Sequence, residues 1–488
     1  MGVDVVQPLR LRFKRRAAKP VPPGQPADPA RKISVNGLIG VGLWILLWLG
    51  YNTGPELAMD PNFPANFTEF IHGVRAFFPM LAGWIALLII FARASRLFPW
   101  IVGPLGLMLL YAVTGMVSTW AYLPSPTAGL YYGANYLAMV LVLLAIVLVA
   151  NPLPDLLKVL RVTWLMSTVL TLALLGAIPL LGSQVAFESD TSPVGMRAYN
   201  GAGTIMGMTS SRNTGFARYA AISALVALPG LMRKGRLVVR IIWGILFTFS
   251  IYALVIANGR TETVAFVGGA VVILGAEKAK RTAYFLVGIG AAILLGLRGF
   301  YSAFFLWFTR TGKLDLTMTG RTTAWEEGWS YLAGSPWVGL GFQSDRYFLH
   351  THLHNAFLHV LFQAGFLGGG GILVGYMIIS YYVIKYFFLR KPADKSLIPP
   401  EIPAIFLFVT ISSVTESTFA YFSATWLMGA PIVAYVMALH RHVRAASAKE
   451  AQERVMRLQL ARRAYRAERS SGGAAAPPLG TSGGLNVL

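Results

Sequence analysis

The chain has 488 residues, of which 55% are hydrophobic and only 13% are charged, and it contains no cysteine. This composition excludes an ordinary soluble domain, and the lack of cysteine excludes disulfide bonds and thiolate chemistry. The formal net charge of +22 would suggest a nucleic-acid partner in a soluble protein. In a membrane protein the distribution of the charge matters more than its sum, and we expect no nucleic-acid partner.

Apolar runs of about 18 or more residues recur along the chain, and each can cross the hydrocarbon core of a bilayer, roughly 30 Å thick, as a helix. No polar segment between these runs is long enough to hold a separate large domain. We therefore predict an all-α polytopic membrane protein.

Residues 1–32 form a basic, proline-rich arm that we expect to be disordered and cytoplasmic. No small-residue cleavage site follows the arm, so we predict that the first apolar run is a retained helix. About twelve membrane-spanning helices are expected, over residues 33–51, 73–92, 98–121, 134–150, 159–182, 215–232, 238–257, 263–276, 283–299, 365–388, 402–420 and 424–439. An even number of spans places both termini on the same side of the membrane.

The charges of the connecting loops indicate which side that is. On one side every loop is basic, and these loops and the two terminal segments hold most of the 42 Lys and Arg residues. Cytoplasmic loops are the ones that carry an excess of Lys and Arg. Both termini are therefore predicted to be cytoplasmic.

The expected organisation has nine spans in residues 33–299, a long outer loop at 300–355 and three spans in 356–440. A loop of this length is usually functional. Within it, Thr323 and Glu326 have capping-box spacing, which predicts that a short helix starts there. Residues 441–470 should form a basic amphipathic helix that rests on the anionic inner leaflet, and residues 471–488 should be disordered.

Four outer arginines are candidates for binding an anionic headgroup. They are Arg212, Arg218, Arg260 and Arg321. A guanidinium keeps its charge and presents a planar fork of donors that suits phosphate. The alternative is that each arginine pairs with an acid or anchors to lipid phosphate, and the acids that we consider for this are Glu262, Glu326 and Glu416.

Four histidines lie close together where the long loop enters an apolar segment. They are His350, His352, His354 and His359. The alternation His-x-His-x-His can bind a metal on a strand, but Asp345 is the one acid nearby and a loop entering a helix is expected here. A single general base is the simpler interpretation, because a neutral imidazole can take a proton from a hydroxyl group near neutral pH.

Glu416 ends an apolar segment on the outer side, where it can orient a base, balance an arginine or simply face water. The chain has no P-loop, no dinucleotide fingerprint and no Asp-x-Asp motif for a metal-bound nucleotide. We therefore expect a substrate that arrives already energised. No cofactor is expected.

Four separated stretches together resemble the family of O-antigen ligases and O-antigen polymerases. They are Arg260 after an Asn-Gly turn, Gly320-Arg321-Thr322 with Trp325, Gly339-Leu340-Gly341-Phe342, and His354-Asn355 followed nine residues later by Gly365-Phe366-Leu367-Gly368. The ligase form of the last motif commonly continues with threonines. Here Gly369 and Gly370 follow, which favours a polymerase over a ligase.

The resemblance implies a metal-independent, inverting glycosyltransferase of the bacterial inner membrane, with the long loop and the active site in the periplasm. The donor would be a glycan on undecaprenyl diphosphate. The acceptor would be the lipid A-core sugar in lipopolysaccharide biosynthesis, another lipid-linked repeat in polysaccharide or exopolysaccharide biosynthesis, or a protein side chain.

The resemblance also implies roles for the site residues. Arg260 and Arg321 would bind the diphosphate and His354 would be the catalytic base, while Arg212 and Arg218 match more loosely. Asn355 and Glu416 are supporting candidates. The alternative class is a transporter or flippase of lipid-linked glycans, but such a protein should carry charge through the middle of the membrane, and the spans here are nearly free of it. A structural subunit would need neither His354 nor the arginines.

Overall fold

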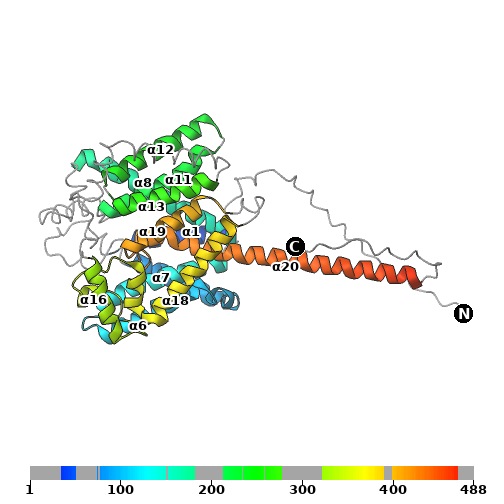
Figure 1. Ribbon diagram of the computed structural model, residues 1–488, viewed down its shortest axis with the longest axis horizontal. Coiled ribbons are helices and arrows are strands. Elements are labelled where there is room, and N and C mark those ends of the chain that lie inside the picture. The colour runs from blue at the N-terminus through cyan, green and yellow to red at the C-terminus, as the bar shows by residue number, and fades with distance from the viewer. Residues whose placement is uncertain are drawn as a thin grey trace.

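The computed structural model describes residues 35–50, 74, 77–149, 152–181, 213–233, 235–257, 259–276, 321–389 and 398–470. All regular secondary structure in these residues is helical, as predicted, and the helices pack into one body from which the end of α20 projects (Figure 1). The elements are α1 (Val35–Gly50), α4 (Phe78–Ala92), η1 (Ala94–Arg96), α5 (Phe98–Ile101), α6 (Pro104–Tyr122), α7 (Thr127–Val149), α8 (Pro152–Leu181), α11 (Asn213–Met232), α12 (Leu237–Ile256), α13 (Arg260–Ala276), α16 (Arg321–Gly334), α17 (Ser344–Phe348), α18 (Ala356–Phe387), α19 (Glu401–Thr415) and α20 (Ala424–Ser470).

Six of the described helices, α6, α7, α8, α11, α12 and α18, are long and apolar enough to cross a membrane. Three more, α1, α4 and α19, are apolar but shorter. Each predicted span has a helical counterpart except 283–299, which lies outside the described residues. The count of about twelve spans and the side of the termini stay predictions.

The last helix differs from the expectation of two separate elements. α20 runs without a break from Ala424 to Ser470, so the predicted last span and the predicted basic helix are one helix. No glycine or proline interrupts the sequence after Pro431, and the residues of the extension are good helix formers. Its apolar side chains are exposed on the projecting part; they are Val455, Met456, Leu458 and Leu460. Their contact with the inner leaflet stays a prediction.

α18 changes direction at Ala364 and Gly365, which do not have helical backbone angles. Gly365 has φ +58°, a conformation that glycine adopts without steric cost. The loop before α17 bonds the backbone groups on both sides of this break. Four hydrogen bonds of 2.8–3.0 Å form: Leu340 N to Phe362 O, Gly341 N to Gln363 O, Phe366 N to Pro336 O and Leu367 N to Trp337 O.

Phe342 fixes the same loop to the helical body. Its side chain is fully buried, and its N–H donates to Oγ1 of Thr119 in α6 at 2.7 Å. Gly115 of α6 and Gly133 of α7 make room for the ring, since a Cβ on either would lie 2.6 or 2.8 Å from it. The glycine-rich stretch 339–342 therefore packs against α6 and α7, and this packing positions α17 and the histidines that follow α17.

The short helix in the outer loop starts earlier than its capping-box spacing predicted. α16 begins at Arg321, so Thr323 and Glu326 lie inside the first turns instead of around the N-cap. Trp325 of this helix donates its Nε1–H to the carbonyl of Leu353 at 2.6 Å. α16 is thereby joined to the loop that carries the histidines, at the end of the body opposite to the projecting part of α20 (Figure 1).

Candidate functional site

His354 and Asn355 form the entry into α18. Asn355 is the N-cap residue: its Oδ1 accepts from the N–H of Leu358 at 2.9 Å, which satisfies one of the free donors of the first turn. Its Nδ2 donates to the carbonyl of Val414 near the end of α19, at 3.1 Å. His354 has φ +47°, which is strained for a residue other than glycine. The contacts of Asn355 hold the turn from which His354 projects.

Glu416 follows α19 and contacts three of the predicted site residues. Its Oε2 lies 3.1 Å from Nη2 of Arg218 and 3.4 Å from Nδ1 of His354. Its Oε1 lies 3.4 Å from Nη2 of Arg321. Arg321 also donates from Nη1 to the carbonyl of Thr415 at 2.8 Å. One carboxylate therefore joins α11, α16 and the start of α18.

A second acid connects the site to α13. Nε of Arg218 donates to Oε1 of the buried Glu262 at 3.1 Å. The hydroxyl of Thr261 lies 3.1 Å from that of Thr415, so the start of α13 meets the end of α19. Arg260 is the first residue of α13 and is half-buried. Its place next to Thr261 puts it at the same end of the molecule as Glu416.

The structure thus brings together most of the residues that the sequence singled out. They are Arg218, Arg321, His354, Asn355 and Glu416. Pairing of the arginines with acids, the alternative raised from the sequence, is present for Arg218 and Arg321. A guanidinium has five N–H donors, so an acid partner does not by itself exhaust its capacity. Arg212 lies outside the described residues.

The electrostatics keep His354 neutral and Glu416 ionised. Burial alone would raise the pKa of the Glu416 carboxyl, but Arg218, His354 and Arg321 hold that pKa well below its usual range. Burial lowers the pKa of the His354 imidazole, and Glu416 only partly offsets this. His354 is therefore available as a proton acceptor near neutral pH, beside two guanidinium groups that can bind an anion.

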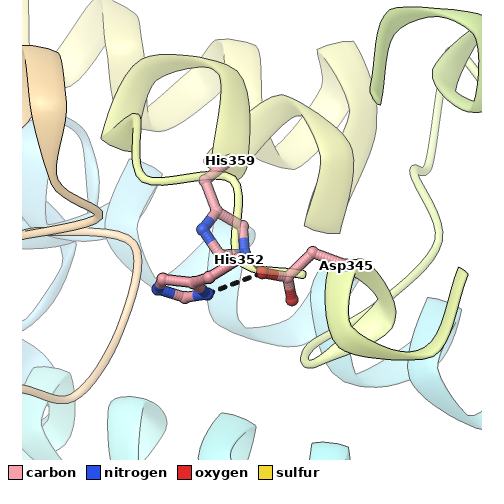
Figure 2. A group of neighbouring side chains, drawn as sticks. All are labelled: Asp345, His352 and His359. Atoms are coloured by element: carbon pink, nitrogen blue, oxygen red, sulfur yellow. Dashed lines mark hydrogen bonds and ion pairs between the residues drawn. The ribbon is translucent and has the colours of Figure 1, made fainter. Parts of the chain in front are cut away.

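Asp345, His352 and His359 form a second polar cluster (Figure 2). Nδ1 of His352 is 2.7 Å from Oδ2 of Asp345, and Nε2 of His359 is 3.4 Å from the same oxygen. Asp345 and His359 are fully buried, whereas 22% of the His352 side chain is exposed. The hydroxyl of Tyr421 lies 2.8 Å from Nε2 of His359 and 3.3 Å from Oδ1 of Asp345.

Asp345, His352 and His359 offer three donor atoms within 4.8 Å of one another, which is the spacing of a candidate metal site. A bound zinc ion would need to lie about 2.0–2.2 Å from each of them. The Tyr421 hydroxyl instead lies within 3.4 Å of all three side chains and bonds among them. The geometry is that of a satisfied hydrogen-bond cluster.

The two clusters touch through their histidines. The rings of His352 and His354 are 4.8 Å apart between centroids and nearly perpendicular, at 87°. Sequence reasoning had a signal for Asp345, as the one acid near the histidines, but assigned it no role. No pattern in the sequence pointed to Tyr421. This residue follows α19, and its ring stacks on His352 at 5.2 Å between ring centroids.

Residues 245–373, from α12 into α18, match the family model described as O-Antigen ligase. This match supports the resemblance to the O-antigen ligase and polymerase family. The matched part of this O-antigen ligase domain includes Arg260, Arg321, His354 and Asn355, whereas Arg218 and Glu416 lie outside it. No curated protein matches the chain. The apolar helices agree with the membrane glycosyltransferase character of the family.

Proposed function

We propose that this protein transfers a glycan from undecaprenyl diphosphate to a sugar hydroxyl at the periplasmic face of the bacterial inner membrane. The observation that carries the proposal is the position of Glu416, which contacts the arginines Arg218 and Arg321 and the imidazole of His354. An anion-binding group and a proton acceptor are thereby held at one place. Transfer from a glycosyl diphosphate needs both of these.

In this proposal Arg321, Arg218 and Arg260 bind the diphosphate, and Arg212 assists them. Their donors stabilise the negative charge that grows on the diphosphate as it leaves. Arg321 is well suited to this because it is held by two contacts, to Glu416 and to the carbonyl of Thr415, that fix the plane of its guanidinium.

His354 is the general base of the reaction. It removes the proton of the acceptor hydroxyl while the oxygen attacks the anomeric carbon. The bond from that carbon to the diphosphate oxygen breaks on the opposite face, and its electron pair stays on the diphosphate, so the configuration is inverted. Glu416 orients the imidazole through Nδ1, which leaves Nε2 to act as the base. No step requires a metal ion or a cofactor.

The placement of the site supports the periplasmic side. His354, Arg321 and Glu416 gather at the end of the body where α16 lies, and the basic extension of α20 projects from the other end (Figure 1). Basic segments remain in the cytoplasm. The site then faces the periplasm, where the lipid-linked donor and the acceptor meet.

The polymerase and ligase activities differ in the acceptor. Gly369 follows the second glycine of the family motif, and a Cβ at this position would lie 2.2 Å from the carbonyl oxygen of Val360. The threonine that is common in ligases would not fit here without a shift of the backbone. This difference supports the polymerase activity, in which the acceptor is another lipid-linked repeat.

The test is the pattern of surface glycolipid and carrier-linked glycan in cells that lack this protein. Long polymer on the undecaprenyl carrier with bare lipid A-core identifies a ligase. Short carrier-linked units, with single repeats on lipid A-core or a missing exopolysaccharide, identify a polymerase. Complementation with wild type restores the normal pattern, and complementation with His354→Ala does not. If His354→Ala restores it, the catalytic assignment is wrong and transport of the lipid-linked glycan is the function to pursue.

A further inference from the structure

The cluster of Asp345, His352, His359 and Tyr421 has no role in the mechanism above, although it contacts the base. Its carboxylate is unusual because it is fully buried and the basic side chains that contact it among the described residues are imidazoles. An isolated buried charge costs several kcal/mol, so a carboxylate in this position favours a positive charge next to it. Of the two imidazoles, His359 is fully buried and His352 is partly exposed. His352 is therefore the one that can exchange a proton with the reaction centre.

We propose that the Asp345–His352 pair is the second proton acceptor of the transfer reaction and takes over the proton that His354 removes from the acceptor hydroxyl. This inference rests on the proposed function. In it the O–H bond of the acceptor breaks at His354, the proton passes to His352, and it is finally released from His352 to water. The diphosphate leaves as the anion, so no additional reactant is required.

The charges around the two histidines favour this direction of transfer. A proton on His354 adds positive charge beside Arg218 and Arg321, which already share the single carboxylate of Glu416. A proton on His352 makes a cation of an imidazole whose Nδ1 lies 2.7 Å from Oδ2 of Asp345, and neither the Arg218 nor the Arg321 ion pair reaches that carboxylate. Imidazolium bonded to a buried carboxylate is a charge-assisted pair, which is the strong kind of hydrogen bond.

The surroundings hold His352 in one orientation. Its Nδ1 faces Asp345 of α17, its ring stacks on Tyr421, and its ring plane is nearly perpendicular to that of His354. Tyr421 is in turn fixed by its hydrogen bond to His359, whose Nδ1 is 2.7 Å from the hydroxyl of Ser417. With Nδ1 used by Asp345, Nε2 of His352 is the nitrogen left for a proton arriving from outside.

The charged and titratable groups that face His352 shift the pKa of its imidazole in both directions. Burial lowers the pKa of its imidazole, Asp345 raises it, and His359 and the exposed Arg346 lower it further. Burial would raise the pKa of the Asp345 carboxyl, but His359 and His352 hold that pKa well below its usual range. His352 is therefore neutral and able to accept a proton near neutral pH, while Asp345 is ionised and able to stabilise the product.

The experiment compares the purified full-length protein and its variants in lipid nanodiscs. Carrier-linked glycan and acceptor extracted from cells lacking the protein are the substrates. For Asp345→Asn and His352→Gln we expect kcat to fall by about 100-fold, within the range for a proton-transfer residue, with the donor KM unchanged. Asp345→Asn removes the charge that raises the pKa of His352, so the acidic limb of its pH–rate profile should move to lower pH. Imidazole added to His352→Ala should restore part of the rate.

His350→Gln is the matched control, because His350 is an exposed histidine of the same loop and should leave kcat unchanged. Normal kcat in Asp345→Asn and His352→Gln, with His354→Ala inactive, would overturn the second proton acceptor and leave the proposed function intact. A lowered rate with an unchanged pH–rate profile, no rescue by imidazole and a lower melting temperature would also overturn it, because these results together indicate a structural role for the pair. Activity of His354→Ala would instead remove the proposed function itself.

Discussion

His354 and Glu416 lie 62 positions apart in the sequence, and Nδ1 of the imidazole is 3.4 Å from Oε2 of the carboxylate. An imidazole held in this way presents its other nitrogen to the substrate, as a general base must. His354→Ala should lower the rate of glycan transfer by at least about 100-fold, measured as glycolipid formed per amount of membrane-inserted protein. Asn355→Ala is a useful comparison, since it removes the cap of α18 but keeps the imidazole, and it should retain more activity.

The contribution of Arg321 to transfer activity should depend on the shape of its side chain and not only on its charge. It uses Nη1 for the carbonyl of Thr415 and Nη2 for Glu416, a two-pronged arrangement that an ammonium group cannot reproduce. Arg321→Lys should therefore lose nearly as much kcat/KM as Arg321→Ala. The control is Arg233→Lys, which changes an arginine paired with Glu401 at 3.0 Å at the other end of α11 and α19. High activity of Arg321→Lys would mean that only the positive charge matters.

The pairing of Glu416 also predicts how stability depends on pH. The pKa of this carboxyl is lowered in the folded protein by its cationic neighbours. A group with a lowered pKa stabilises the fold above its unfolded pKa, about 4.3 for glutamate, and this stabilisation is lost as the pH falls through the folded value. The difference in melting temperature between wild type and Glu416→Gln should be constant from about pH 5 to 8 and shrink in more acidic buffer.

Glu401→Gln is the control for Glu416→Gln. Glu401 is a buried acid at the start of α19 and pairs with Arg233, away from the site. It should change stability without changing the donor KM, whereas Glu416→Gln should change both. Equal effects of the two variants on the donor KM would contradict a role of Glu416 in holding the diphosphate-binding arginines.

Metal chelation separates the two interpretations of the histidine-rich loop. The Tyr421 hydroxyl bonds among Asp345, His352 and His359, so the cluster is complete without an ion. EDTA should leave the activity of the purified protein unchanged across several concentrations. Inhibition that is reversed by added zinc or another divalent ion would restore the metal interpretation.

The helices could be predicted because their signal is local. An apolar run forms a helix in a membrane wherever it occurs, since every backbone group must be bonded within the segment. Composition was thus enough to predict the helices of the described residues, and short patterns were enough to single out the motifs around Arg321 and His354. The sequence offered Glu416 as a partner for a base or for an arginine. That one carboxylate contacts His354, Arg218 and Arg321 together was not predictable, because it depends on how α11, α16, α18 and α19 pack.

The Asp345–His352 pair could not be predicted from the sequence for a related reason. Alternating histidines point to one face only in a regular strand, and this loop has positive φ angles at Gln343, His350 and His354. These conformations turn His352 toward Asp345 and His354 toward Glu416. A rule based on spacing alone cannot anticipate such turns in residues other than glycine.

Gly365 provides a test of the fold that supports the site. It has φ +58°, and a Cβ there would lie 2.3 Å from the carbonyl carbon of Trp337, a backbone atom that cannot move aside cheaply. Gly365→Ala should destabilise the protein by about 3 kcal/mol or more, since strain and overlap add. The loop that forms hydrogen bonds across the break would be displaced, and with it α17 and the histidines, so transfer activity should be lost together with thermal stability.

Gly370→Ala is the matched control on the same helix. A Cβ at Gly370 would meet only Phe366, at 4.0 Å, which is an ordinary contact. Alanine is the better helix former by about 1 kcal/mol, so this variant should be as stable as wild type or slightly more stable, with normal transfer. If Gly365→Ala melts at the same temperature as Gly370→Ala, the break in α18 is not the feature that positions the loop, and the hydrogen bonds from Leu340 and Gly341 are not what holds His352 and His354 in place.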